Sequence, residues 1–127
     1  MADRYLLDTD VLIEYLRGIK PAIKFLEGLE GELILSAITV AGLYSGVRDQ
    51  GEEEALDNFL FAFDVAPVDE DLAREGGLIR KEYHHSHGVG LADALIAATA
   101  QIRSAILVTF NRRHYPMLED LVVPYER

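Results

Sequence analysis

Short apolar runs alternate along this chain with segments of helical periodicity, and this alternation is the feature that most restricts the fold. We expect strands at Arg4–Leu7, Glu32–Leu35, Asp64–Ala66 and Ala105–Thr109, and a short last strand at Val122–Pro124. We expect helices at Val11–Leu16, Pro21–Leu29, Thr39–Val47, Glu52–Phe61, Asp69–His85 and Leu91–Arg103. Strands that alternate with helices form a parallel sheet with helices on both faces. The sequence therefore predicts a three-layer α/β/α fold with a central parallel sheet.

The size and composition of the chain fit one cytoplasmic domain spanning residues 1–127. Half of the residues are apolar, enough to bury a single core. The absence of cysteine excludes disulfides and cysteine–zinc sites and fits a reducing compartment. No signal-peptide pattern is visible at the N-terminus, and no apolar run reaches the ~18 residues that a membrane span needs. We therefore expect no membrane contact.

The charge balance is unusual for a protein that handles nucleic acid. Asp and Glu number 22 against 12 Lys and Arg, for a formal net charge of −10. Surfaces that bind phosphates are normally basic, so composition alone argues against a nucleic-acid partner. A metal site formed by some of the acids would reverse the local sign of the charge, and clustering of the basic residues would have a similar effect.

Three acids stand where chemistry is expected in an α/β fold. Asp8 directly follows the first predicted strand, and parallel sheets carry their sites beyond the carboxyl ends of strands, although an acid of the turn is the alternative interpretation. Asp10 comes two residues later, and we interpret it as the N-cap of the next helix. Asp93 is the only charged residue between His87 and Arg103. A carboxylate in a buried helix needs a partner or a metal ion, although a first-turn acid favoured by the helix dipole is the alternative interpretation.

A polar pair ends the last long strand. Thr109 closes this strand and Asn111 follows, either as a turn residue or as a source of a ligand oxygen. Asn111 would lie near Asp8 and Asp93 if the strands Arg4–Leu7 and Ala105–Thr109 are neighbours. Such an oxygen-rich set suits Mg²⁺ or Mn²⁺ better than zinc.

Basic residues accompany these polar groups. Arg80 and Lys81 precede the Asp93 segment, and Arg112 and Arg113 follow Asn111. They would form a positive rim able to contact an RNA backbone. The alternative is a set of solvated cations near helix ends.

Four segments resemble, in order, the motifs of PIN-domain ribonucleases of the VapC toxin type. They are Leu6–Ile13, Ser36–Gly46, Leu91–Ala100 and Val108–Tyr115, and together they span nearly the whole chain. The resemblance implies that Asp8 and Asp93 are the principal ligands of Mg²⁺ or Mn²⁺. It places Asn111 at a position where the family has Asp or Asn, and it gives Thr109 the role of holding that turn or a metal-bound water.

The function implied by the resemblance is that of a toxin. It is a metal-dependent endoribonuclease that hydrolyses RNA, often tRNA or ribosomal RNA, forms a homodimer, and is silenced by a VapB-type antitoxin. The antitoxin would lie over the region of the helices Pro21–Leu29 and Thr39–Phe61.

One departure from the family pattern bears on activity. Gly42 stands where the second motif normally carries Glu, which removes one of the family's acids and weakens a helix by roughly 1 kcal/mol relative to Ala. Either a natural degenerate member or a selected or engineered change of Glu to Gly accounts for it. A non-catalytic, antitoxin-binding PIN fold is therefore an alternative function.

A phospho-receiver domain is a further alternative of the same size and class. It is disfavoured because it needs an Asp after the middle strand and a Lys after the last. Here Ser36 and Phe110 occupy those places.

Overall fold

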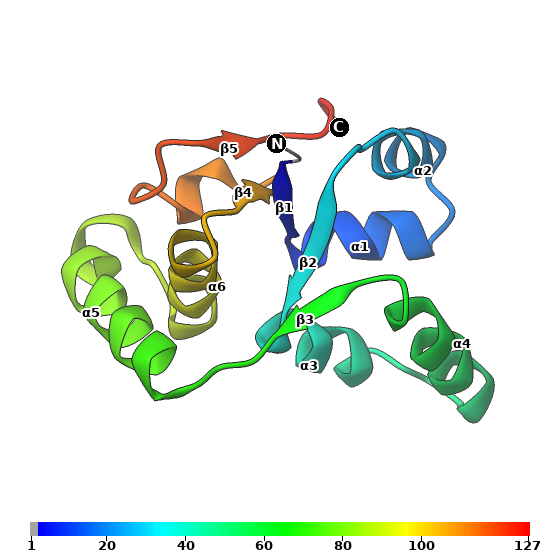
Figure 1. Ribbon diagram of the computed structural model, residues 1–127, viewed down its shortest axis with the longest axis horizontal. Helices are drawn as coiled ribbons and strands as arrows, with labels where there is room; N and C mark the ends of the chain where they lie inside the picture. The colour runs from blue at the N-terminus through cyan, green and yellow to red at the C-terminus, as the bar shows by residue number, and fades with distance from the viewer. Residues whose placement is uncertain (1–2) are drawn as a thin grey trace.

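A five-stranded parallel sheet with the strand order β3-β2-β1-β4-β5 forms the centre of the molecule (Figure 1). The structure is a computed structural model that describes residues 3–127. The strands are β1 (Arg4–Leu7), β2 (Glu32–Ser36), β3 (Asp64–Ala66), β4 (Ile106–Val108) and β5 (Leu121–Val122). The helices are α1 (Thr9–Leu16), α2 (Lys20–Glu27), α3 (Ala37–Ser45), α4 (Gln50–Leu60), α5 (Glu70–His87) and α6 (Leu91–Ile102), with a 3₁₀ turn η1 (Arg112–His114).

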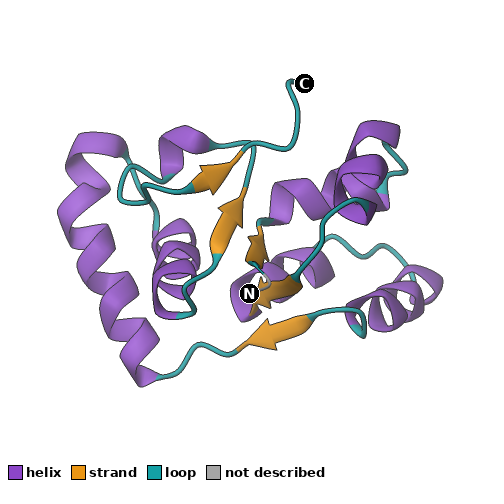
Figure 2. Cartoon of the chain, turned by 45° about the horizontal axis from the view of Figure 1, so that its top comes forward, coloured by secondary structure: helices purple, strands orange, loops and turns teal. Residues whose placement is uncertain are grey.

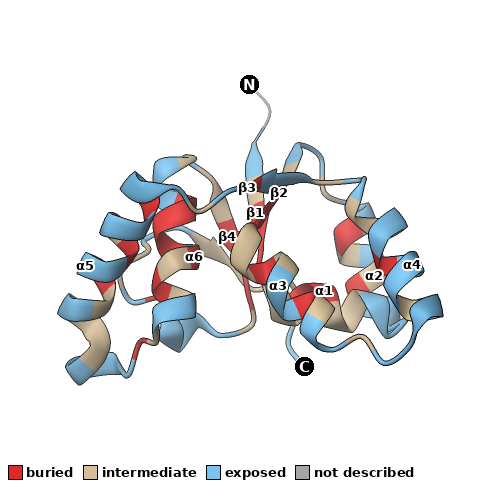
Figure 3. Cartoon of the chain, turned by 90° about the horizontal axis from the view of Figure 1, so that it is seen from below, coloured by how far each residue is buried: buried red, intermediate tan, exposed pale blue. Residues whose placement is uncertain are grey.

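Both faces of the sheet are covered, as the sequence predicts. Successive side chains of a strand point to opposite faces. Leu6 of β1 packs in a core cluster with α5 and α6, whereas its neighbour Leu7 packs in a second cluster with residues of α1, α2 and α4. Leu107 and Val108 of β4 divide in the same way. Figure 2 shows the helices in two groups with the strands between them, and Figure 3 shows buried residues on their inner sides. The three-layer α/β/α prediction is confirmed.

The strand order separates this fold from a phospho-receiver domain. Receiver domains have the order 2-1-3-4-5, whereas the order here is 3-2-1-4-5. After β3 the chain crosses to the other side of β1 and forms β4 there, so the strand order reverses between β1 and β4. Ligands of open α/β sheets bind at such a point, beyond the carboxyl ends of the strands. Asp8 and Thr109 directly follow these two strands.

Most predicted elements are present, with shifts at their ends that capping side chains explain. The predicted helix Val11–Leu16 begins two residues earlier, because the Asp8 carboxylate caps it by accepting from the backbone N–H of Thr9 at 2.8 Å. Asp10 lies in the first turn of α1, so its interpretation as the N-cap is wrong. Ser36, Asp49 and Asp69 cap α3, α4 and α5 in the same manner. The last strand ends at Val122, earlier than predicted.

Gly76 lets α5 approach α6 closely. A Cβ at Gly76 would lie 2.5 Å from Leu95 Cδ2 and 3.2 Å from the Leu95 Cα. A glycine that weakens an isolated helix is therefore required here for packing. Gly77 beside it meets nothing within 4 Å.

None of the helices within residues 3–127 is both long and apolar enough to cross a membrane.

Candidate active site

Asp8 and Thr109 meet at the carboxyl ends of the two neighbouring strands β1 and β4. The pairing of Leu7 with Val108 brings their successors together, and the Asp8 N–H donates to Val108 O at 2.9 Å. The Thr109 hydroxyl donates to Asp8 Oδ2 at 2.8 Å. Both residues are buried. The two strands are neighbours, as predicted, and the Thr109 hydroxyl therefore holds the Asp8 carboxylate in place.

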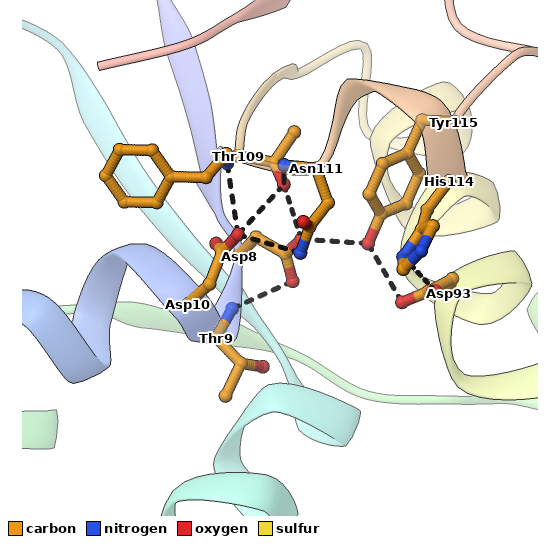
Figure 4. A network of polar contacts seen from close by, with 9 residues as sticks. Asp8, Thr9, Asp10, Asp93, Thr109, Asn111, His114 and Tyr115 are labelled. Carbon is orange, nitrogen blue, oxygen red and sulfur yellow. Dashed lines mark hydrogen bonds and ion pairs between the residues drawn. The ribbon is translucent and has the colours of Figure 1, made fainter. Parts of the chain in front are cut away.

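Tyr115 connects Asp8 with Asp93 (Figure 4). Its hydroxyl lies 2.9 Å from Asp8 Oδ2 and 3.2 Å from Asp93 Oδ1, and the residue is 1% exposed. The structure therefore brings the two predicted metal ligands to opposite sides of one hydroxyl group. Sequence reasoning missed Tyr115, which lies in a loop without strand or helix periodicity.

Asp93 stands in the first turn of α6, where the helix N-terminus faces solvent. Its side chain is 30% exposed, and it lies in the first turn as the alternative interpretation expected. His114 Nδ1 lies 3.0 Å from Asp93 Oδ2.

Asp10 is a third acid of the site, with a position that the N-cap interpretation did not foresee. Its Oδ2 accepts hydrogen bonds from the backbone N–H of Phe110 at 3.0 Å and from Asn111 Nδ2 at 3.1 Å. Its Oδ1 is buried without a hydrogen-bond partner among the described residues. The pattern Asp8-Thr9-Asp10 after a buried strand was the available signal.

Thr109 and Asn111 form the turn that follows β4. The Thr109 hydroxyl donates to Asp8 and accepts from the backbone N–H of Asn111 at 3.0 Å. The Asn111 side chain is anchored by Asp10 and is exposed at the rim. Asn111 thus joins Asp8 and Asp93 in one network, as the sequence analysis expected of its position.

Burial raises the pKa of the two acids that follow β1, Asp8 and Asp10. Burial raises the pKa of Asp8, an effect that hydrogen bonds from Thr109, Thr9 and Tyr115 counter and the charge of Asp93 reinforces. Burial, followed by the charge of Asp8, raises the pKa of Asp10 to about 6. Burial and the charges of Asp8 and Asp93 also raise the pKa of the Tyr115 phenol, which keeps it protonated and able to donate.

Gly42 lies on α3, facing the start of α1. A Cβ there would meet Thr9 Cγ2 at 3.5 Å, an ordinary contact, so nothing in the backbone or packing requires glycine. Thr9 adjoins Asp8 and also contacts Thr39 of α3 through a hydroxyl–hydroxyl bond of 3.1 Å. Within residues 3–127, no three His, Cys, Asp or Glu side chains are grouped so that they could hold a metal ion together. The site lacks an acid on the α3 side.

The predicted basic rim is placed only in part. Arg112 and Arg113 are exposed on η1, between Asn111 and His114 of the network. Arg80 and Lys81 lie on α5, and the hydrogen bonds and ion pairs among the described residues do not connect them with the carboxylates. Contact of these four residues with RNA stays a prediction.

A groove beside the site opens between α1, α3 and α4. It has a volume of about 590 Å³, and Gly42 is part of its wall. Apolar residues line most of it, with charged groups at the edge: Ile13, Leu16, Arg17, Leu43, Gly46, Val47, Arg48, Glu52, Ala55 and Leu56. The groove overlaps the region Thr39–Phe61 in which the sequence analysis expected a partner, but α1 takes the place of the expected helix α2.

Comparison with known proteins places this geometry in a family. Residues 5–117 match the PIN domain. The chain belongs to the PIN-domain family. Among its relatives, Ribonuclease VapC10 of Mycobacterium tuberculosis is 39% identical over 123 residues, covering 94% of this chain and 92% of the relative. Ribonuclease VapC19 of the same organism is 40% identical over 124 residues, covering 94% and 98%.

A solved structure with a similar fold agrees with this family assignment. A toxin–antitoxin complex from Klebsiella pneumoniae contains a chain with a TM-score of 0.85 and 28% identity, covering 97% of this PIN domain and 99% of that chain. The family predicted from the four motifs is confirmed. Asp8, Asp93, Thr109 and Asn111 of this PIN domain are connected in one hydrogen-bond network through Tyr115 and Asp10.

Proposed function

We propose that this PIN domain is a toxin of the VapC type, an endoribonuclease that hydrolyses RNA phosphodiester bonds with Mg²⁺ or Mn²⁺. The observation that carries the proposal is the meeting of Asp8 and Asp93 at the Tyr115 hydroxyl, at the point of the sheet where ligands bind. The ribonuclease relatives, which match the chain over nearly their whole length, support the same reaction.

The residues present fit a hard divalent cation. Mg²⁺ is commonly held by one or two carboxylates, with water and substrate phosphates completing its shell. Asp8 and Asp93 supply two carboxylates, and the buried Oδ1 of Asp10 has no hydrogen-bond partner within residues 3–127. Burial raises the pKa of Asp8 and Asp10, and a bound cation would counter this effect by favouring their charged form. When bound, such an ion makes water more acidic and stabilises charge on the phosphate.

In this proposal the protein's own residues position the ion and the RNA. Asp8 and Asp93 bind the ion, Thr109 holds the Asp8 carboxylate and the following turn, and Asn111 presents its amide at the rim. Arg112 and Arg113, with Arg80 and Lys81, contact the RNA backbone, which supplies affinity without sequence preference. The substrate is an exposed single strand of tRNA or ribosomal RNA, because sequence-specific proteins contact RNA mainly in unpaired segments.

The partner is a VapB-type antitoxin that binds the groove between α1, α3 and α4. The groove is lined mainly by apolar residues, together with Arg17 and the ion pair Arg48–Glu52, which suits an amphipathic segment with an acid that faces Arg17. The toxin–antitoxin complex found among the solved structures supports a partner of this kind. A homodimer and a cytoplasmic location belong to the same proposal.

Gly42 favours a second candidate function, that of a non-catalytic PIN fold that only binds its antitoxin. The two are separated by incubating total RNA with the chain and with Gly42→Glu, each with and without Mn²⁺. We expect metal-dependent cleavage that is stronger for Gly42→Glu and is abolished by Asp93→Asn in the same background. An absence of cleavage by both proteins at all Mn²⁺ concentrations would favour the non-catalytic candidate.

A further inference from the structure

The Asp93 carboxylate is held by two consecutive residues at the end of η1, His114 and Tyr115. His114 Nδ1 lies 3.0 Å from Oδ2 and the Tyr115 hydroxyl 3.2 Å from Oδ1, so both oxygens have a fixed neighbour. The same hydroxyl reaches Asp8 Oδ2 at 2.9 Å. A hydroxyl carries one proton and donates to one carboxylate at a time, so it serves both acids by alternation.

The ring of Tyr115 makes this contact rigid. The residue belongs to the core cluster that α5 and α6 form on one face of the sheet. Its backbone N–H donates to Arg112 O at 3.1 Å, and its carbonyl accepts from Leu118 N at 3.1 Å. A side chain fixed by packing and by its own backbone holds its polar end in one place.

Packing alone does not account for the hydroxyl. A phenylalanine would fill almost the same volume, and a buried hydroxyl adds a group that must find partners. Here both partners are carboxylates, which make stronger bonds than neutral acceptors. Two acids that face each other without a cation also repel, and a donor between them reduces that repulsion.

We propose that Tyr115 is a positioning residue of the cation site, whose hydroxyl holds Asp8 and Asp93 at ligand separation before an ion binds. The inference rests on the proposed function for the identity of the two ligands. Among the described residues, this hydroxyl forms hydrogen bonds with both proposed ligands, Asp8 and Asp93.

The test compares two tyrosines that each donate to a carboxylate. Tyr115→Phe removes the hydroxyl at the site. Tyr125→Phe removes a hydroxyl that donates to Glu14 Oε1 at 2.8 Å, outside the site.

Mn²⁺ affinity is measured by calorimetry and by the electron paramagnetic resonance of free Mn²⁺, for the chain and for its Gly42→Glu form. Loss of an outer partner of metal ligands typically weakens metal binding about 10- to 100-fold, and we expect Tyr115→Phe to fall in this range. Tyr125→Phe should leave the affinity unchanged.

A second readout separates positioning from a loss of fold. In the Gly42→Glu form, Tyr115→Phe should lower RNA cleavage at limiting Mn²⁺, and a higher Mn²⁺ concentration should restore kcat without a change in the KM for RNA. If Tyr115→Phe is too unstable to isolate, the comparison is made in a Gly77→Ala background, which adds helix propensity where the structure leaves open space.

The outcomes distinguish the two proposals. Unchanged or tighter Mn²⁺ binding by Tyr115→Phe, beside normal binding by the parent, would overturn the inference alone. Cleavage defects that Mn²⁺ does not restore would also overturn it, because they would indicate a purely structural role. Absence of Mn²⁺ binding in both parent proteins would overturn the inference together with the metal part of the proposed function.

Discussion

The carboxylate of Asp10 accepts a hydrogen bond from the side-chain amide of Asn111 at 3.1 Å. The same oxygen accepts from the backbone N–H of Phe110, so one acid at the start of α1 holds the loop after β4. This loop also carries Thr109, whose hydroxyl holds Asp8. The two segments that supply the site are thus joined by side chains beyond the point where the strands stop pairing.

Removal of the Asp10 acceptor should destabilise the protein. Asp10→Ala leaves the Phe110 N–H without its partner, which costs about 1–3 kcal/mol for a buried group. Asp10→Asn keeps an acceptor oxygen and should cost less. Urea unfolding of the three proteins checks the order of their free energies of unfolding. Equal values for Asp10→Ala and the parent would show that the loop does not depend on this bond.

The stability of the metal-free protein should depend on the ionisation of Asp10. The carboxyl has a pKa of about 6 in the folded chain, above the value of about 3.9 in unfolded chains, so folding favours its protonated form. Its contribution is fully present below pH ~3.9 and is lost as the pH rises through about 6. The free energy of unfolding of the parent, relative to that of Asp10→Asn, should therefore fall between pH 4 and 7.

The measurement is urea unfolding with a chelator present at several pH values. Carboxylates outside the site affect both proteins alike, so the difference reports Asp10 together with its coupling to Asp8. A difference that stays constant with pH, or that grows in favour of the parent as the pH rises, would contradict the prediction.

Two adjacent glycines of α5 should respond oppositely to the same substitution. Gly76→Ala places a Cβ 2.5 Å from Leu95 Cδ2 and 3.2 Å from the Leu95 backbone, so α5 and α6 must separate. Overpacking of this kind costs typically about 1–3 kcal/mol. Gly77→Ala meets open space and should stabilise the helix by up to about 1 kcal/mol. Thermal midpoints of the two variants test the contrast, and a stabilised Gly76→Ala would refute the close packing.

Local signals in the sequence were sufficient for the layers and for Asp8, but not for the contacts between distant segments. The run Tyr5-Leu6-Leu7 before an acid indicates a buried strand that ends at a site. Asp8 and Asp10 both precede a helix, and only the position of the backbone decides which of them caps it. The pattern of apolar residues cannot find Tyr115, because its contact with Asp8 joins residues 107 positions apart. The role of Gly76 is likewise set by α6 and not by its own helix.

Restoring the acid at position 42 should couple stability to the cation. The Cβ of a substituted residue has room beside Thr9, next to Asp8, and replacement of glycine within α3 favours the helix by up to about 1 kcal/mol. Gly42→Gln shares the shape of Gly42→Glu without its charge and is the matched control. In metal-free protein the added carboxylate repels Asp8 and Asp93, so Gly42→Glu should be less stable than Gly42→Gln.

An ion that binds only the folded state raises stability in proportion to the logarithm of its concentration over Kd. Mn²⁺ should therefore raise the thermal midpoint of Gly42→Glu more than that of Gly42→Gln or the parent. Expression of Gly42→Glu without antitoxin should slow growth, whereas the parent is tolerated. Equal Mn²⁺ responses of Gly42→Glu and Gly42→Gln would place residue 42 outside the cation site, because the two differ only in the charge that the ion would recognise.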